Sequence, residues 1–232
     1  MDGKPDARLA LIERFFSGTG RSYDFMVNAA TFGIDRLWKR RIVELLPRDA
    51  TRIVDLACGT GISTLAIARK FPDARIVGVE LRDEYLAIAR EKFRKLGMRN
   101  VEFVLSRAEE FAPAERFDCV VSSYLAKYAD LARLTRNTHA MLEPGGLLLM
   151  HDFTYPPKPV LRRVFWLYFS VMRGAGSRFF PAWREIFHGL PELIQATRWL
   201  SELERELRSN RFTDLRTEYL TLYGSAIVTA RK

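Results

Sequence analysis

The sequence predicts a Rossmann-like α/β fold: a doubly wound, mostly parallel sheet of seven strands, with helices on both faces and an antiparallel strand at the C-terminal edge. Three observations lead to this expectation. Short apolar runs alternate with helical stretches from residue 51 to residue 153. A turn with two glycines, Gly59 and Gly61, directly follows the first apolar run. Two β-like runs close the chain after the last predicted helix.

The first fifty residues are predicted to form a helical cover. Apolar side chains recur at helical spacing over residues 8–16 and again over residues 34–46. Pro47 and Asp49 end the second of these helices.

Residues 51–153 are predicted to form the core of the fold. We expect strands at residues 53–57, 75–79, 101–105, 117–121 and 147–150. We expect helices at residues 63–71, 83–96 and 131–142. Asp83 and Gly97 are residue types that begin and end a helix. This alternation favours parallel strands with helical crossovers.

The C-terminal third departs from this rhythm. Residues 155–159 hold too many prolines for a regular element. Residues 154–190 are predicted to be a basic, aromatic lid or a membrane-facing insertion. Residues 191–232 are predicted to be a helix at about 192–208 and a hairpin of runs 214–222 and 225–229, joined near Gly224. We expect one domain over residues 1–232.

Composition limits the setting of the protein. The net charge is +9 and the pI is near 9.8, which predicts attraction to nucleic acid, an acidic substrate or an anionic lipid surface. Two separated cysteines, Cys58 and Cys119, predict no disulfide and no metal site, and favour a cytoplasmic location. No apolar run approaches the ~20 residues of a membrane span, and the N-terminus is not of signal-peptide type. A peripheral position on the inner membrane face stays open.

The turn after the first strand carries the predicted cofactor site. Gly59 and Gly61 let the backbone turn tightly and a ligand approach closely. Asp55 precedes the turn, and a carboxylate there suits an amino group better than a pyrophosphate. Glu80 ends the second strand, where it can accept hydrogen bonds from a ribose. Thr64 stands where a dinucleotide motif has its third glycine. These features favour S-adenosylmethionine over NAD; the competing interpretation is an ordinary turn between solvated carboxylates.

Four stretches together resemble the motifs of class I methyltransferases. Motif I is matched by residues 53–61, IVDLACGTG. The motifs of the second, fourth and fifth strands are matched by VGVE at 77–80, FDCVV at 117–121 and LEPGG at 142–146. The resemblance implies the Rossmann-like fold and S-adenosylmethionine as the cofactor.

A narrower resemblance is to the ubiquinone/menaquinone biosynthesis C-methyltransferase family. It rests on YDFMVN at residues 23–28, FGIDRLWKR at 32–40, DFT at 152–154 and the ending 219–232. Together with the turn, it implies these cofactor-binding residues: Tyr23, Asp55, Ala57, Gly59, Gly61, Thr64, Glu80, Leu81, Arg107, Ala108 and Ser122. One departure concerns the acceptor, because Ala126 stands where the family has an arginine thought to lie at the quinol.

Three residues beyond the fourth and fifth strands are predicted to be catalytic: Tyr124, His151 and Asp152. A base that removes or shares a phenolic proton would enrich a quinol ring carbon in electrons. Lys127 is a further candidate at the same mouth. A structural, hydrogen-bonded role is the competing interpretation for His151.

The predicted function is methyl transfer to a hydrophobic acceptor, with C-methylation of a prenylated quinol at the membrane surface as the leading hypothesis. The alternatives are N-methylation of a phospholipid amine, methylation of another small molecule, an RNA methyltransferase, and a cofactor-binding protein without activity. The basic, aromatic residues 156–190 would meet anionic lipid or cover the substrate, or simply pack as a core. A nucleic-acid partner is not expected, since no RNA-binding module is visible.

Overall fold

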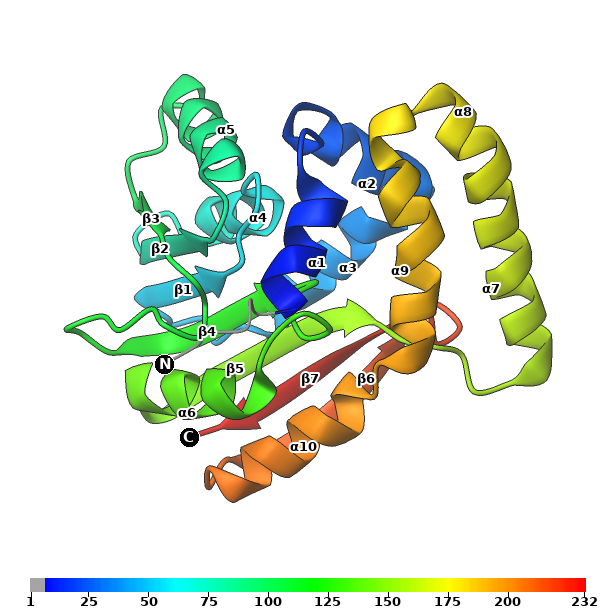
Figure 1. Ribbon diagram of the computed structural model, residues 1–232. Coiled ribbons are helices and arrows are strands. Elements are labelled where there is room, and N and C mark those ends of the chain that lie inside the picture. The colour runs from blue at the N-terminus through cyan, green and yellow to red at the C-terminus, as the bar shows by residue number, and fades with distance from the viewer. Residues whose placement is uncertain (1–6) are drawn as a thin grey trace, which may run out of the picture.

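The computed structural model describes residues 7–232, so the first six residues of the predicted N-terminal cover lie outside the described part. One seven-stranded sheet runs through the molecule in the order β3-β2-β1-β4-β5-β7-β6 (Figure 1). Its strands are β1 (Arg52–Leu56), β2 (Arg75–Glu80), β3 (Val101–Leu105), β4 (Phe117–Ser123), β5 (Leu142–Phe153), β6 (Thr213–Leu220) and β7 (Ser225–Arg231). The first five strands are parallel, and β7 is antiparallel to both of its neighbours.

The helices divide into those that cover the sheet and those that cover its carboxyl edge. The sheet is flanked by α3 (Ile34–Leu45), α4 (Ile62–Lys70), α5 (Asp83–Lys95), α6 (Leu131–Met141) and α10 (Trp199–Ser209). The edge is covered by α1 (Ala7–Phe16), α2 (Tyr23–Ala30), α7 (Pro159–Val171), α8 (Ser177–Phe179) and α9 (Arg184–Ala196), with short turns of helix at Gly20–Ser22, Met172–Gly176 and Pro181–Trp183.

Alternation along the strands builds a hydrophobic core on each face of the sheet. Ile53 and Val54 are adjacent in β1 and fully buried on opposite faces. The Val54 face packs against α6 and α10, and the Ile53 face packs against α3, α4 and α5. Strands buried on both sides need helices on both sides, which explains the continuous apolar runs of the sequence.

A third hydrophobic cluster lies away from the sheet and holds the cover together. Its buried members come from α1, α2, the loop after β4, the helical turn Pro181–Trp183 and the start of α9: Phe15, Met26, Tyr128, Trp183, Ile186 and Phe187. The cover therefore has its own small core, built from segments more than 150 residues apart in the chain.

The sequence-based expectations are largely confirmed. The mostly parallel seven-stranded sheet and the C-terminal hairpin are present, with β7 inside and β6 at the edge. The predicted strand at 147–150 is longer, from Leu142 to Phe153, because β4 and β7 pair along it. In the part of the chain that the structure describes, no helix is long and apolar enough to cross a membrane.

One prediction is wrong: the helix at about 192–208 is two helices. Thr197 is extended (φ −81°, ψ 128°), so α9 ends at Ala196 and α10 begins at Trp199. The Trp199 indole donates a 2.7 Å hydrogen bond to the Phe153 carbonyl at the end of β5. This anchor ties α10 to the sheet while α9 belongs to the cover.

Candidate active site

The turn between β1 and α4 has the tight geometry that its glycines allow. Gly61 lies at φ +83°, and a Cβ there would stand 2.9 Å from the ring of Phe93. Ala57, at φ +57°, is held in the same left-handed region without being glycine. The backbone therefore curls at the carboxyl edge of the sheet, where open α/β sheets bind ligands.

Glu80 joins the ends of β1 and β2. One carboxylate oxygen accepts a 2.9 Å hydrogen bond from the Gly59 N–H, and the other accepts one of 2.9 Å from the Arg82 N–H. Burial raises the pKa of the Glu80 carboxyl, and these backbone donors oppose that shift. Glu80 thus fixes the turn on which the cofactor is expected to lie.

Asp55 lies beneath the turn and is buried. Its Oδ2 accepts a 2.7 Å hydrogen bond from the Thr64 hydroxyl, while its Oδ1 has no partner among the described residues. Burial raises the pKa of Asp55 from 3.8 to about 6. Among the described residues, only one of the two oxygens of this buried carboxylate is therefore hydrogen-bonded.

A cavity of about 480 Å³ opens at this edge of the sheet, a size in the usual range of small-molecule sites. Seven of the predicted cofactor-binding residues line it: Tyr23, Ala57, Gly59, Glu80, Leu81, Arg107 and Ala108. The other four do not line it, and these are Asp55, Gly61, Thr64 and Ser122. The cavity thus begins at the turn, with Asp55 and Thr64 behind the residues that face it.

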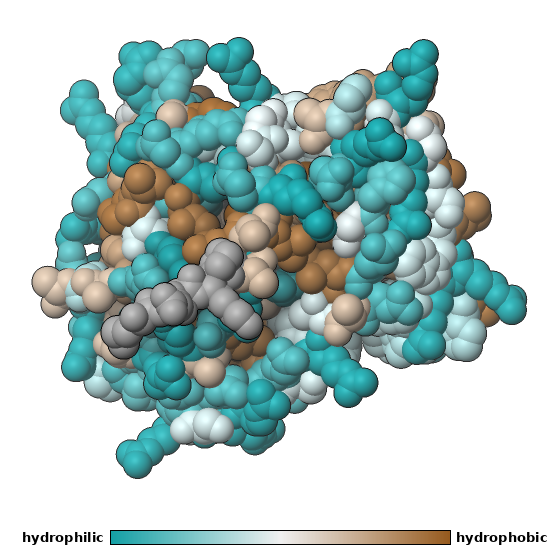
Figure 2. Space-filling view, viewed as in Figure 1, coloured by the Kyte–Doolittle hydropathy of each residue, from teal (hydrophilic) through white to brown (hydrophobic). Residues whose placement is uncertain are grey.

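The cavity continues from the turn to an apolar mouth. Its far wall is aliphatic and aromatic, with side chains of α7 and α9 such as Phe165, Tyr168 and Phe187. Three lining residues are also strongly exposed, which places them at the opening: Phe32 at 77%, Val164 at 58% and Leu222 at 75%. Figure 2 shows hydrophobic residues crossing the middle of the face that α1 and α9 cover, and others at the margin formed by α7.

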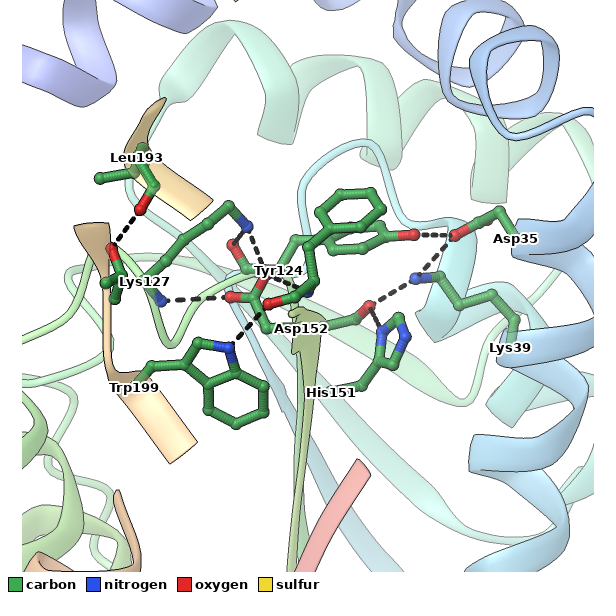
Figure 3. A network of polar contacts seen from close by, with 11 residues as sticks. Asp35, Lys39, Tyr124, Lys127, His151, Asp152, Leu193 and Trp199 are labelled. Atoms are coloured by element: carbon green, nitrogen blue, oxygen red, sulfur yellow. Dashed lines mark hydrogen bonds and ion pairs between the residues drawn. The ribbon is translucent and has the colours of Figure 1, made fainter. Parts of the chain in front are cut away.

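Behind the cavity wall lies a buried polar network (Figure 3). The Tyr124 hydroxyl donates a 2.5 Å hydrogen bond to Asp35, and the Lys39 ammonium lies 3.3 Å from the same carboxylate oxygen. Lys39 also donates to the Ser123 hydroxyl at 2.5 Å, and Ser123 lies 2.8 Å from Nδ1 of His151.

Ser123 links Lys39 to His151 within this network. An ammonium can only donate, so the Ser123 hydroxyl accepts from Lys39, and the same hydroxyl shares a hydrogen bond with Nδ1 of His151. Burial, with the Lys39 and Lys127 ammonium groups nearby, holds the pKa of His151 well below its usual range. The ring is therefore neutral at physiological pH, and its Nε2 has no hydrogen-bond partner among the described residues.

A second buried ion pair lies beside the first. The Lys127 ammonium is 2.5 Å from Oδ1 of Asp152, and the Lys127 backbone N–H donates to Oδ2 at 3.1 Å. In Figure 3 the two lysines approach the Tyr124 ring from opposite sides, with Nζ atoms 4.2 Å (Lys39) and 5.3 Å (Lys127) from its centroid. Tyr124 stacks on Phe153 at 4.6 Å.

The predicted catalytic residues fall into two groups. Tyr124 lines the cavity, whereas His151 and Asp152 are fully buried behind it. Lys127 lines the cavity, but Ala126, at the position of the family's arginine, packs into the core on the α6 and α10 face. Sequence reasoning missed Asp35, Lys39 and Ser123, although the WK pair at 38–39 marked that helix. No group of metal-binding side chains occurs within residues 7–232.

Solved structures similar to this chain share its fold. A geranyl diphosphate C-methyltransferase from Streptomyces coelicolor superposes with a TM-score of 0.62, over 87% of this chain and 82% of that one, at 18% identity. A phosphoethanolamine N-methyltransferase from Haemonchus contortus superposes with a TM-score of 0.62, over 84% of this chain and 52% of that one, at 15% identity. The sheet order and the turn after β1, with these neighbours, show the fold of class I methyltransferases.

The chain belongs to the ubiE/COQ5 methyltransferase family, whose model matches residues 4–229. A demethylmenaquinone methyltransferase of Thermus thermophilus is 33% identical over 221 residues, which are 91% of this chain and 97% of that protein. A ubiquinone/menaquinone biosynthesis C-methyltransferase UbiE of Proteus mirabilis is 33% identical over 165 residues, 69% of this chain and 66% of that protein. The chain spans slightly less than two thirds of several such UbiE relatives. The predicted fold, family and cofactor are confirmed.

Proposed function

We propose that this protein transfers a methyl group from S-adenosylmethionine to a ring carbon of a prenylated quinol. The observation that carries the proposal is that one continuous cavity runs from the turn at Gly59 and Glu80 to an apolar mouth. Such a cavity suits a polar cofactor at one end and a ring with a long apolar tail at the other. The relatives named for demethylmenaquinone and ubiquinone/menaquinone methylation support this acceptor.

The cofactor half of the cavity supplies the methyl donor's binding groups. We assign cofactor binding to the residues that line this half, with Asp55, Gly61, Thr64 and Ser122 shaping the turn from behind. When bound there, S-adenosylmethionine supplies an electrophilic methyl group. Methyl transfer needs an in-line approach and a site without water more than elaborate acid–base groups. The apolar wall of the acceptor half meets that need.

The predicted catalytic residues take two kinds of role. Tyr124 faces the acceptor, where its ring and the aromatic wall hold the quinol flat. Asp152 acts through Lys127, and His151 acts through Ser123, because neither carboxylate nor imidazole lines the cavity. Both are positioning residues for groups that do.

Product analysis tests the function. Purified protein receives methyl-labelled S-adenosylmethionine and vesicles that contain demethylmenaquinol, kept reduced. We expect label in the extracted quinone, retained after hydrolysis that would remove an O-methyl group. Label in a phospholipid amine, or in added RNA, with none in quinone would overturn the proposal. Protein without reductant is the control, because a quinone lacks the nucleophilic ring.

We also propose that the mouth meets the membrane surface. Along α7 the outer side chains Val160, Leu167 and Val171 are exposed at 65%, 67% and 51%, and basic residues such as Arg163 lie among them. This mixture suits insertion of apolar side chains among anionic headgroups. A tail leaving between Phe32, Val164 and Leu222 would then enter the bilayer directly.

Flotation with vesicles tests the membrane contact. We expect binding to vesicles that contain phosphatidylglycerol, weaker binding to purely zwitterionic vesicles, and loss of binding in Leu167→Glu. The matched control is Leu96→Glu, since Leu96 is 48% exposed at the end of α5, away from the mouth. Equal effects of the two variants would contradict a membrane role for α7.

A further inference from the structure

Lys127 is a buried ammonium that faces the acceptor half of the cavity. Its side chain is 2% exposed, and it is among the residues that line the cavity. A lysine is rarely buried unless it is paired, and its partner here is the fully buried Asp152 on β5. The pair thus brings a positive charge to an otherwise apolar wall.

A count of donors leaves one N–H of Lys127 for a ligand. An ammonium has three donors. One is used by Asp152 Oδ1 at 2.5 Å and a second by the Tyr124 carbonyl at 3.3 Å. Within the described chain, the third meets only aromatic faces: Nζ lies 4.7 Å from the Tyr128 centroid and 5.4 Å from that of Phe153. Those rings belong to the cavity wall.

The neighbouring pair, Lys39 and Asp35, shows what a purely structural arrangement looks like. It is also buried, and its ammonium also lies over Tyr124. Lys39, however, donates to both Asp35 and Ser123, and neither Lys39 nor Asp35 lines the cavity. The two pairs differ in access to the ligand rather than in burial or charge.

We propose that the Lys127 ammonium, positioned by Asp152, donates to the oxygen of a phenolic acceptor and stabilises its phenolate. This inference rests on the proposed function, because it takes the acceptor to be a quinol. Charge-assisted donors aimed at developing negative charge in a dry site contribute strongly to rate. Burial lowers the pKa of Lys127, and the charge and hydrogen bond of the Asp152 carboxylate oppose that shift.

The proposed methyl transfer proceeds in three steps that conserve atoms and charge. The phenol releases its proton to solvent and stays bound as the phenolate. The ring carbon beside the oxygen attacks the sulfonium methyl group; the new C–C bond forms as the C–S bond breaks, and sulfur keeps the electron pair. The ring carbon then loses its hydrogen as a proton and the oxygen regains one when the product leaves the dry site and meets solvent, which restores the aromatic quinol.

Absorbance of a bound probe tests the inference without turnover. The probe is 1-naphthol, bound to the full-length protein loaded with S-adenosylhomocysteine and titrated with base. The variant is Lys127→Met with Asp152→Asn, which removes the ion pair without leaving one charge buried alone. The matched control is Lys39→Met with Asp35→Asn, and tight S-adenosylhomocysteine binding confirms that each variant is folded.

We expect the pKa of bound 1-naphthol to lie about one unit or more below its solution value in the wild type and in the Lys39 variant. In the Lys127 variant it should return to the solution value or above. With quinol as substrate, kcat/KM should fall about 100-fold at neutral pH and recover as the pH approaches the pKa of the free quinol. Lys127→Arg should retain part of the shift, and Asp152→Asn alone should give an intermediate one.

Three results would overturn the inference: a wild type that does not bind 1-naphthol or shift its ionisation, an unchanged shift in the Lys127 variant, or equal losses in both double variants. Failure of the proposed function is a separate outcome. If the probe responds to Lys127 but no quinol is methylated, the site accepts another phenol. If quinol is methylated but Lys127 has no influence, only this inference fails.

Discussion

The two ends of the cavity are built in different ways. The proposed cofactor end comes mainly from residues 57–109, a continuous stretch in which the turn after β1 and the end of β2 form most of the wall. The acceptor end is assembled from α1, α2, the loop after β4, α7, α9 and the β6–β7 turn. A site made from one stretch leaves a motif in the sequence, whereas an assembled site leaves separate residues that acquire meaning only in space.

The sharpest test of this difference is Glu80→Ala. It removes the acceptor of two backbone N–H groups at once, so the turn loses its brace. We expect affinity for S-adenosylmethionine to fall about 100-fold or more, measured by calorimetry, since each tenfold loss is about 1.4 kcal/mol. Glu102→Ala, an exposed strand glutamate on β3, is the control and should bind normally. Similar affinities in the two variants would mean that the turn does not depend on Glu80.

The acceptor end should instead be disrupted by a substitution that disturbs the packing of its helices. A Cβ on Gly189 in α9 would stand 2.6 Å from the buried Phe15 ring of α1, so Gly189→Ala pushes these two helices apart. We expect cofactor affinity to stay within about threefold and kcat/KM for the acceptor to fall about tenfold, because dry, aligned packing is lost. Gly174→Ala adds the same atom where nothing lies within 4 Å. If both variants behave alike, the α1–α9 contact does not shape the acceptor site.

The smallest expected effect concerns stability and its pH dependence. The folded-state pKa of Asp55, about 6, lies above its ordinary value of 3.8, so the folded protein holds this proton more tightly than the unfolded chain does. The wild type therefore loses stability as the pH rises from about 4 to 6, and the full cost, at most about 3 kcal/mol, remains above pH 6. Asp55→Asn should raise the free energy of unfolding at pH 7.5 by about 1 kcal/mol, less than the full cost of about 3 kcal/mol because the buried amide needs a new acceptor.

Asp118→Asn supplies the opposite case. The Thr51 and Arg52 N–H groups donate to the Asp118 carboxylate and, against the effect of burial, hold its pKa below the usual value. Its stabilising contribution is present at neutral pH and lost as the pH falls through the lowered pKa. Thermal unfolding should show a gain for Asp55→Asn that shrinks as the pH falls from about 6 to 4, and a loss for Asp118→Asn that changes little over that range and shrinks only below about pH 4. Parallel curves would contradict the assignment of Asp55 as the strained carboxylate.

The contrast between local and assembled parts of the molecule also explains how much of the structure the sequence could predict. Strands buried on both faces read as apolar runs such as residues 53–57, so the sheet and the turn were predictable from local pattern. The break at Thr197 was not, because the helical periodicity on both sides continues through it and the cause is distant: Trp199 bonds to Phe153.

Within the site, residue type alone did not predict which side chains reach the cavity and which lie buried behind its wall. Asp152 and His151 are chemically suited to catalysis and stand at a strand end, but both side chains lie behind the cavity wall. Asp35 and Lys39 face that network from a helix 84 or more residues earlier in the chain. Only the packing of α3 against the sheet brings them together, and no spacing rule encodes it.

The position of β7 has a consequence for synthesis on the ribosome. Because β7 lies between β5 and β6, neither can complete its pairing until residues 225–231 have been made. At about 5–20 residues per second, several seconds pass between the end of β5 and the end of β7. Throughout that interval the apolar stretch Leu147–Met150 presents an open backbone edge, the kind of edge that joins to other chains. The nascent protein thus passes through a stage in which a chaperone or the ribosome surface can shield the open edge of this apolar stretch.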